Sequence, residues 1–457
     1  MPRGRSVPEF AWGGPVRSRS ALSWCIAPSS PGTRCRRLLD PSVMNHPKHT
    51  LLVALLISSS WLMGSVAPRA AGDPSDGDWP QWRGPDRDGV SRETNWTSEG
   101  QPKDLWKASV GLGYSTVSVA NGRLYTLGYD VEQELDVVFC LDAETGEEVW
   151  THAYPAKIWN LMHAGGTLTT PTVDGDVVYT SNREGKLFCF DAATGEIRWE
   201  RDLAAELELT PPKWGFAASP IVFGNMLVLN LGRILALEKE SGETIWITEE
   251  SSGSAYSTPE LFARGDRSLL AAFNSDGLAV HDLKDGARVA FHEWKTQFDV
   301  NSATPIAVAG KLFVSSGLGR GCGMFELGDD GLEVVWESKI MRTKLSGVVL
   351  YEGHLYGIDE AELRCISLTG EEMWRERGIK DGAIVIAGGR LVCLNQDGDL
   401  IVAKASPDGF EELSRKKVLE GGKYWSTPVV SGGRIYCRNS KGDLVCRDHR
   451  VAKAGAR

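Results

Sequence analysis

The sequence predicts an all-β fold, an eight-bladed β-propeller made of four-stranded antiparallel blades. Three observations lead to this prediction: a polar turn motif with a tryptophan at a fixed offset, a hairpin pattern that precedes it, and a spacing of about 44 residues between successive copies. Four strands in about 40–45 residues are typical of a propeller blade. Seven blades are the alternative, if one of the divergent segments 346–376 or 382–415 is not a separate unit.

The polar turn motif is clearest in DAETGEEVW, residues 142–150, and DAATGEIRW, residues 191–199. An Asp side chain accepts hydrogen bonds from turn amides, and glycine supplies the positive φ that such a turn needs. A Trp four residues after the glycine offers a large apolar face for packing between neighbouring blades. We therefore assign structural roles to Asp142, Gly146, Trp150, Asp191, Gly195, Trp199, Gly242, Trp246, Gly370 and Trp374.

The hairpin pattern consists of a short β-branched run, a turn rich in Gly, and an alternating apolar strand. Its eight copies span 311 residues, or seven intervals of about 44, and they begin at Ser115, Thr169, Ala218, Ser257, Ala303, Ser346, Gly382 and Ser426. The last copy is not followed by a fourth strand ending in Trp, whereas residues 103–109 form a lone strand around Trp106. We predict that residues 103–109 complete the eighth blade and close the ring, which removes its free edge.

The first 71 residues do not belong to this pattern. Residues 1–43 hold seven Arg, no Lys and two acidic residues, and we interpret them as a disordered upstream extension, with translation starting at Met44 rather than Met1. Residues 44–71 combine a weakly basic start, an apolar run and small residues, the layout of a secretory signal peptide; an uncleaved anchor is the alternative. Residues 72–102 are then a lead-in segment, 103–450 the propeller, and 451–457 a disordered tail.

The charge balance is acidic. The formal net charge is -10, and 41 basic against 58 acidic residues after residue 71 give -17, which disfavours a nucleic-acid partner. We expect an exported monomer of the periplasm or cell envelope, or a secreted one, with no stable membrane span once the signal peptide is removed. Its partners would be other envelope or secreted proteins.

Seven cysteines follow residue 71, without an adjacent pair. Cys140, Cys189 and Cys365 occupy equivalent positions in their blades, which is typical of small apolar core residues. Cys437 and Cys446 flank the last hairpin, and the sequence leaves open whether they form a disulfide. No His/Cys cluster has metal-ligand spacing.

A ligand of a propeller is expected over the central channel, among the loops that lead into the innermost strands. These loops contribute aromatic, basic and acidic side chains that would suit an anionic aromatic ligand, although any propeller mouth is polar and aromatic. The candidates are Tyr114, His163, Lys213, Trp214, Tyr256, Asp299, Asn301, Lys344, Asp381, Tyr424 and Trp425.

The repeated DAxTGxxxW pattern closely resembles the tryptophan-docking repeat of the pyrroloquinoline quinone (PQQ) family of propellers. That family includes quinoprotein alcohol dehydrogenases and the non-enzymatic BamB outer-membrane assembly factors. The resemblance covers roughly residues 79–449, and the opening DWPQWRGPDRDGVS, residues 78–91, looks like the start of exported bacterial PQQ-binding-like propellers. The repeat is specific for the fold, but enzymes and scaffolds share it.

The resemblance therefore implies two functions. The favoured one is a non-catalytic binding or scaffolding protein of the cell envelope. The alternative is a PQQ- and calcium-dependent alcohol or sugar dehydrogenase, in which Asp299 would be the general base, Asn301 and Asp299 calcium ligands, and Trp214 or Trp425 a stacking face. The sequence departs from both patterns, because it lacks the adjacent Cys pair of many family enzymes and the lipidation Cys of the assembly factors.

Overall fold

The structure is a computed structural model of the chain. It describes residues 77–100, 102–160, 163–254 and 256–451. Contacts divide the chain into residues 1–63 and 64–457, and every described residue belongs to the second unit. The expected extension 1–43 and signal peptide 44–71 lie outside the described residues, as do residues 452–457 of the expected tail.

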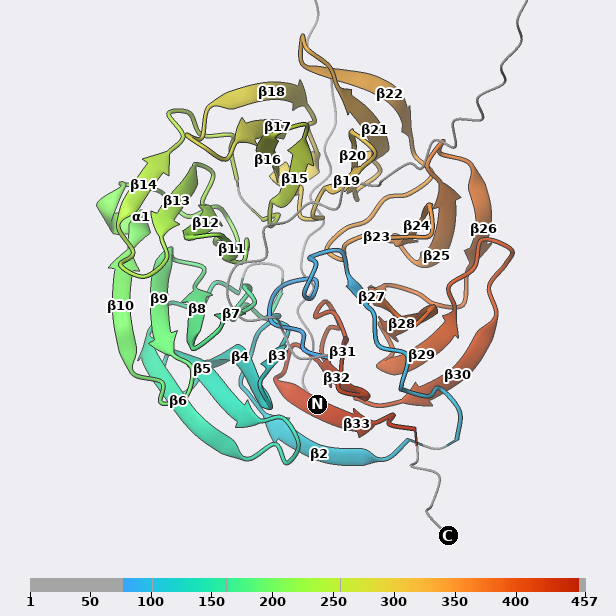
Figure 1. Ribbon diagram of the computed structural model, residues 1–457. Helices are drawn as coiled ribbons and strands as arrows, with labels where there is room; N and C mark the ends of the chain where they lie inside the picture. The colour runs from blue at the N-terminus through green and yellow to red at the C-terminus, as the bar shows by residue number, and fades with distance from the viewer. Residues whose placement is uncertain (1–76, 101, 161–162, 255, 452–457) are drawn as a thin grey trace, which may run out of the picture. The chain divides into compact units, whose positions relative to one another are not determined.

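The described residues of the second unit form eight sheets arranged in a ring, and within each repeat the first strand lies nearer the centre than the strands that follow it (Figure 1). The prediction of eight blades rather than seven is confirmed. Blade 1 contains β3 (Ser118–Ala120), β4 (Arg123–Asp130), β5 (Leu135–Asp142) and β6 (Glu148–Pro155), and blade 2 contains β7 (Thr172–Asp174), β8 (Val177–Ser181), β9 (Lys186–Asp191) and β10 (Ile197–Asp202). Blade 3 contains β11 (Ile221–Phe223), β12 (Met226–Asn230), β13 (Ile234–Glu238) and β14 (Thr244–Ile247), and blade 4 contains β15 (Glu260–Arg264), β16 (Arg267–Asn274), β17 (Gly277–Asp282) and β18 (Arg288–Glu293). Blade 5 contains β19 (Ile306–Val308), β20 (Lys311–Ser316), β21 (Gly321–Leu327) and β22 (Leu332–Ser338), and blade 6 contains β23 (Val349–Tyr351), β24 (His354–Asp359), β25 (Glu362–Ser367) and β26 (Glu372–Glu376). Blade 7 contains β27 (Gly382–Ala387), β28 (Arg390–Asn395), β29 (Asp399–Lys404) and β30 (Glu412–Lys417), and blade 8 contains β31 (Val429–Ser431), β32 (Arg434–Arg438) and β33 (Asp443–Asp448).

The eighth blade is completed from the other end of the propeller. Strand β2 (Asp104–Ser109) pairs antiparallel with β33, with Trp106 opposite Cys446. Residues 103–109 therefore close the ring as predicted, and β33 has no open edge. Blade 7 gains a fifth strand, because β1 (Val90–Ser91) pairs parallel with β27.

The hairpin between the first two strands of a blade depends on residues that accept positive φ. In blade 1, Asn121 and Gly122 have φ of 52° and 73°, and in blade 8, Gly432 and Gly433 have 60° and 68°. Two successive positive φ values define the tight turn whose twist matches that of the paired strands. This explains why Asn-Gly and Gly-Gly recur at these positions.

The core lies between neighbouring blades rather than in one centre. Each of seven buried apolar clusters joins adjacent blades; one of them combines Tyr125 and Trp150 of blade 1 with Phe190 of blade 2. Middle strands such as β9 are therefore buried on both faces, whereas outer strands such as β10 are largely exposed. Helices are short, namely α1 (Leu203–Glu206) and a 3₁₀ turn at Gln297–Asp299, and among the described residues none is long and apolar enough to cross a membrane.

The tryptophans of the repeat join each blade to the next. Trp106 of blade 8 donates its indole N–H to the Ala143 carbonyl of blade 1, and its ring covers Gly146. Trp199 of blade 2 bonds the Lys239 carbonyl of blade 3 in the same way and covers Gly242. The polar turn of one blade is thus the docking surface for the tryptophan of the blade before it.

The cysteines are buried in this packing. All seven described cysteines are free. Cys437 is paired with Val445 across the last hairpin, and Cys446 with Tyr436, so their side chains lie on opposite faces of the sheet. A Cys437–Cys446 disulfide is therefore absent from the structure.

Candidate functional site

Hydroxyl groups at the start of the innermost strands, or in the loops that lead into them, hydrogen-bond to the neighbouring blade. Ser118 donates to the Pro171 carbonyl of the next blade, and Thr172 donates to Pro220 at 2.7 Å. Ser257 donates to Ala303 at 3.0 Å. These bonds fix the loops at the mouth of the channel against one another.

A cavity of about 370 Å³ lies at this mouth. Six of the predicted candidates line it: Tyr114, His163, Trp214, Tyr256, Lys344 and Trp425. The residues are contributed by loops before β3, β7, β11, β15, β23 and β31, so the cavity is central rather than part of one blade. Its volume is near the lower end of the roughly 300–1,000 Å³ of small-ligand pockets.

One wall of the cavity is a compact aromatic group. Tyr114 and Trp425 stack with ring centroids 4.7 Å apart and planes 25° from parallel. His163 meets both rings edge-on, with centroid distances of 5.3 and 5.7 Å. Burial lowers the pKa of His163, so this ring is neutral at pH 7 and the wall carries no charge.

Lys344 supplies the positive charge of the cavity. The cavity-lining residues in the described ranges include this lysine but no Asp or Glu. None of the ion pairs in those ranges involves Lys344. Lys213 lies outside the lining, where its ammonium group is 4.9 Å from the Trp214 ring centroid and 5.6 Å from that of Phe298.

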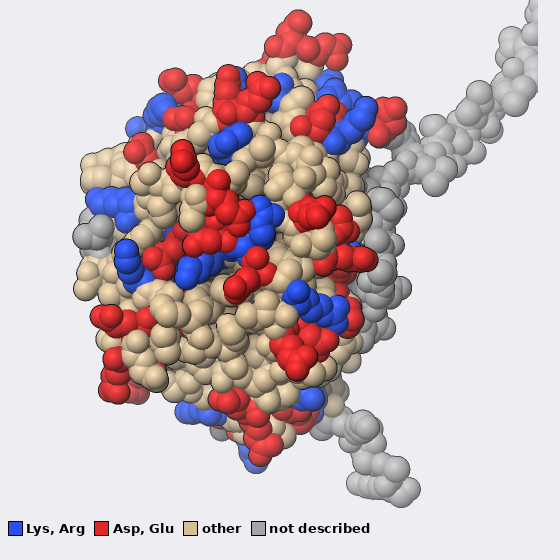
Figure 2. Space-filling model, turned by 90° about the vertical axis from the view of Figure 1, so that its left-hand side faces the viewer, with Lys and Arg blue, Asp and Glu red and all other residues tan. Residues whose placement is uncertain are grey.

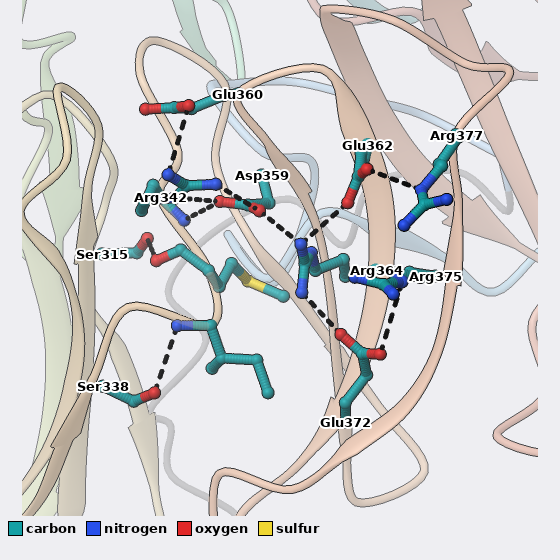
Figure 3. A network of polar contacts seen from close by, with 12 residues as sticks. Ser315, Ser338, Arg342, Asp359, Glu360, Glu362, Arg364, Glu372, Arg375 and Arg377 are labelled. Atoms are coloured by element: carbon teal, nitrogen blue, oxygen red, sulfur yellow. Dashed lines mark hydrogen bonds and ion pairs between the residues drawn. The ribbon is translucent and has the colours of Figure 1, made fainter.

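The loop that carries Lys344 is anchored by a charged network in blade 6 (Figure 3). The buried Asp359 carboxylate accepts hydrogen bonds from the backbone N–H and the Nε of Arg342 at 2.9 and 2.7 Å. Its second oxygen lies 2.9 Å from Nη2 of Arg364, which in turn pairs with two glutamates of the same blade. Arg342 stands two residues before Lys344, so this network positions the lysine.

The floor of the cavity comes from the lead-in segment, outside the repeats. Trp82 lines the cavity and donates its indole N–H to Thr304 at 3.1 Å. The neighbouring Arg83 donates to the Val348 carbonyl at 2.9 Å, and Trp79 forms a bridge with Val119. In Figure 1 this blue segment lies across the centre of the ring, and its contacts with blades 1, 5 and 6 make it a floor under the mouth.

Glu260 lies below the mouth at the start of β15. Burial raises the pKa of its carboxyl group to about 7, against the opposing attraction of Arg83 and Arg87. The Arg83 guanidinium itself donates to the carbonyls of Arg87, Asp88 and Val348. Glu260 is therefore a protonatable group inside the channel rather than a part of the cavity wall.

The remaining candidates are not part of the cavity lining. Tyr424 is buried in the cluster around blades 7, 8 and 1. Asp299 is exposed on the 3₁₀ turn. Asp381 is half-buried; burial raises the pKa of its carboxyl group, and nearby Lys344 and Lys423 oppose this shift.

Asn301 is sealed in the core. Its amide nitrogen donates to the carbonyls of Asn274 and Trp294 at 2.7 and 3.0 Å, and its oxygen accepts from Ser316 at 2.7 Å. All hydrogen-bonding groups of this fully buried amide are thus engaged in joining blades 4 and 5. The described residues also contain no group of three His, Cys, Asp or Glu side chains that could hold a metal ion. The residues present do not fit a calcium-bound quinone.

The sequence-based candidates omitted the apolar part of the cavity. The omitted lining residues include Trp82, Leu168, Phe298, Val300, Leu318 and Leu345. Phe298 directly precedes the candidate Asp299, and it is the aromatic residue of this loop, not the acidic one, that lines the cavity. Trp82 offered one signal, since it is a tryptophan that the repeat does not account for.

The repeat residues with assigned structural roles lie away from the mouth, in the turns between third and fourth strands and on the fourth strands. Asp191 accepts hydrogen bonds from the amides of Ala193 and Thr194, both at 3.0 Å. A hydrogen bond from Arg198 and those amides lower the pKa of Asp191 to about 2. Asp142 accepts equivalent bonds from Glu144 and Thr145. These carboxylates serve the turns.

Comparison with protein families matches residues 137–376 to the PQQ_2 family, described as outer membrane protein assembly factor BamB. The match covers more than half of the chain. The chain belongs to this family. A comparison with curated proteins gives no match.

Solved structures of the same fold include assembly factors and enzymes. BamB from Moraxella catarrhalis is 17% identical, with 76% of this chain and 100% of that chain covered and a TM-score of 0.57. Quinohemoprotein alcohol dehydrogenase from Comamonas testosteroni is 13% identical, with coverage of 83% and 82% and a TM-score of 0.63. A europium-containing methanol dehydrogenase is 11% identical, with coverage of 81% and 89% and a TM-score of 0.59. At these identities the likeness concerns the fold alone.

Proposed function

We propose that the protein is a non-catalytic binding or scaffolding propeller of the cell envelope, and that it binds other envelope or secreted proteins at the mouth of its channel. The observation that carries this proposal is the lining of the mouth cavity, which has aromatic walls, a Trp82 floor and one lysine but no carboxylate in the described ranges. Such a lining suits recognition of an apolar group. It offers no carboxylate base and, among the described residues, no set of metal ligands, and its one imidazole, that of His163, packs edge-on against Tyr114 and Trp425.

Export belongs to the same proposal. The apolar run from Leu51 to Ala67 and the small residues after it support secretion with a signal peptide over residues 44–71. The protein would then act as a soluble monomer of the periplasm or envelope, or outside the cell. The surface is compatible with solubility, since basic and acidic side chains are interspersed on the side that faces the viewer in Figure 2.

The competing function is a PQQ- and calcium-dependent dehydrogenase, which the similarity to quinohemoprotein alcohol dehydrogenases favours. The engaged amide of Asn301 weighs against it, because the oxygen that would bind calcium is fully buried and already accepts a hydrogen bond from Ser316, while the nitrogen holds the side chain in the core through two further bonds. Lys344 is also the single cation of the described lining, a weak counterpart for a cofactor with several carboxylates.

Cofactor retention distinguishes the two functions. The purified full-length protein would be incubated with PQQ, with and without calcium, then desalted and assayed for dye reduction with a panel of alcohols and sugars. We expect no calcium-dependent retention and no turnover. Tight calcium-dependent retention with turnover, lost in Asp299→Ala, would replace the binding function by the dehydrogenase.

A further inference from the structure

The rim of the mouth cavity contains a strained, exposed aromatic residue. Phe298 and Asp299 have φ of 65° and 59°, and the Phe298 side chain is 49% exposed. A bulky residue at positive φ is uncommon and costs conformational energy, so such strain is typical of ligand-binding segments. The structure keeps Phe298 at the rim, although its exposure and its backbone are both unfavourable.

A second apolar residue of the cavity lining is exposed and has a positive φ. Leu318, in the turn between β20 and β21, has φ of 55°, is 41% exposed and lines the same cavity. Phe298, in the loop before β19, and Leu318 thus both present apolar side chains to the cavity from blade 5, whereas Tyr114 and Trp425 line it from the loops before β3 and β31. Exposed apolar residues that border an aromatic cavity are typical of an interaction site.

The dimensions of the cavity limit what it accepts. With about 370 Å³ above the Trp82 floor, it has room for one or two side chains and not for a folded domain. The Tyr114–Trp425 pair offers flat faces that suit an aromatic side chain. An extended chain that inserts a single aromatic residue satisfies both conditions.

The described lining of the cavity carries one positive charge, that of Lys344, although the chain as a whole is acidic. The chain has a net charge of -10, yet Lys344 lines the cavity and Lys213 lies beside Phe298. Lys344 has no ion-pair partner among those identified in the described ranges, and the Asp381 carboxylate on which its charge acts lies outside the cavity lining. A ligand carboxylate inside the cavity could therefore pair with Lys344 directly. A carboxylate next to the inserted aromatic residue is the complementary group.

We propose that the mouth cavity binds an extended acidic-aromatic peptide segment of a partner protein. The aromatic side chain inserts between the Tyr114–Trp425 wall and the Trp82 floor, a neighbouring carboxylate pairs with Lys344, and Phe298 with Leu318 cover the peptide backbone. This inference rests on the proposed binding function, and it specifies the chemistry of the partner.

Three blocked peptides test the inference against the full-length protein by isothermal titration calorimetry. They are Ac-Gly-Glu-Phe-Glu-Gly-NH₂, its lysine analogue Ac-Gly-Lys-Phe-Lys-Gly-NH₂ and its alanine analogue Ac-Gly-Glu-Ala-Glu-Gly-NH₂. We expect the first to bind at least about tenfold more tightly than either analogue, because each analogue lacks one of the two contacts. Equal affinities, or no binding of the first peptide, would overturn the inference.

A charge reversal identifies the basic contact. Lys344→Glu is expected to weaken binding of the acidic peptide by about tenfold or more and to strengthen that of the lysine analogue. Lys416→Glu is the matched control, since it makes the same change at an exposed position on β30. Similar losses in both variants would indicate a net-charge effect and would contradict a role for Lys344.

The strained residue is tested by Phe298→Gly. Glycine adopts a φ of 65° without steric cost, so the variant is expected to keep its unfolding midpoint while the acidic peptide binds about fivefold or more weakly. Unchanged peptide affinity would contradict the role of Phe298. If the acidic peptide fails to bind and PQQ is not retained either, the peptide inference falls while the broader binding function stands; calcium-dependent PQQ retention with turnover would overturn both.

Discussion

The indole ring of Trp150 lies directly on the backbone of Gly195, which belongs to the next blade. A Cβ atom at Gly195 would lie 2.6 Å from the ring, and the φ of Gly195 is 74°. The Trp150 indole N–H also donates to Ala192 at 3.0 Å, so tryptophan, glycine and turn form one contact between blades.

Gly195→Ala is therefore expected to lower the free energy of unfolding by about 2–4 kcal/mol, since it combines a strained φ with a steric clash. Gly175→Ala is the matched control: its φ is 63°, but nothing lies within 4 Å of the added Cβ. The control should cost only about 1 kcal/mol. Equal losses in denaturant unfolding would show that the tryptophan contact contributes nothing.

The Asp359 carboxylate is expected to be a strong contributor to the stability of blade 6. Asp359→Asn leaves Arg342 and the largely buried Arg364 without their shared counter-charge, and should cost about 3–5 kcal/mol. Glu360→Gln removes a more exposed partner of Arg342, 3.3 Å away, and should cost less than about 1 kcal/mol. Urea unfolding of the two variants measures the difference; a small effect of Asp359→Asn would contradict the anchoring role of the network.

Glu260 is expected to make stability depend on pH. The pKa of its carboxyl group is about 7 in the folded protein, raised by burial above an ordinary value of 4.5. The folded state therefore binds more protons than the unfolded state between pH 4.5 and 7, and the contribution of Glu260 to stability falls as the pH rises through this window.

The substitution Glu260→Gln changes the free energy of unfolding by an amount that should depend on pH. This change should be about 1–3 kcal/mol more stabilising above pH 7 than below pH 4.5. Glu240→Gln, on an exposed turn, makes the same charge change and serves as the control. Denaturant unfolding at several pH values gives the two differences. A Glu260→Gln effect that does not vary with pH would exclude titration of this group.

The buried cysteines are expected to be unreactive in the folded protein. Burial raises the pKa of the Cys393, Cys437 and Cys446 thiols to about 12, so thiolate is scarce at pH 8. In a variant with Cys25 and Cys35 replaced by serine, a thiol reagent should label none of the seven remaining cysteines before unfolding and all seven in guanidinium chloride. Rapid labelling of the native variant would contradict the packing between blades.

The repeated pattern was sufficient to predict the blades and their closure. Turn residues such as Asn121 and Gly122, and the offset from Gly195 to Trp199, are local signals, because a tight turn and a strand are formed by residues close together in the chain. The unpaired strand around Trp106 predicted closure, since the last repeat lacked a fourth strand. For the same reason, six candidates at equivalent loop positions were found together at the mouth.

The composition of the cavity was decided by contacts between distant parts of the chain. Trp82 reaches Thr304 across 222 residues, and no local pattern encodes that meeting. Asn301 stands next to the mouth in sequence, yet the hydrogen bonds of its amide draw it into the core between blades 4 and 5. Local periodicity thus determines the strands, the turns and the order of the blades. The tertiary packing of the ring and its lead-in segment decides which side chains line the cavity, because these side chains come from positions that only the closed ring brings together.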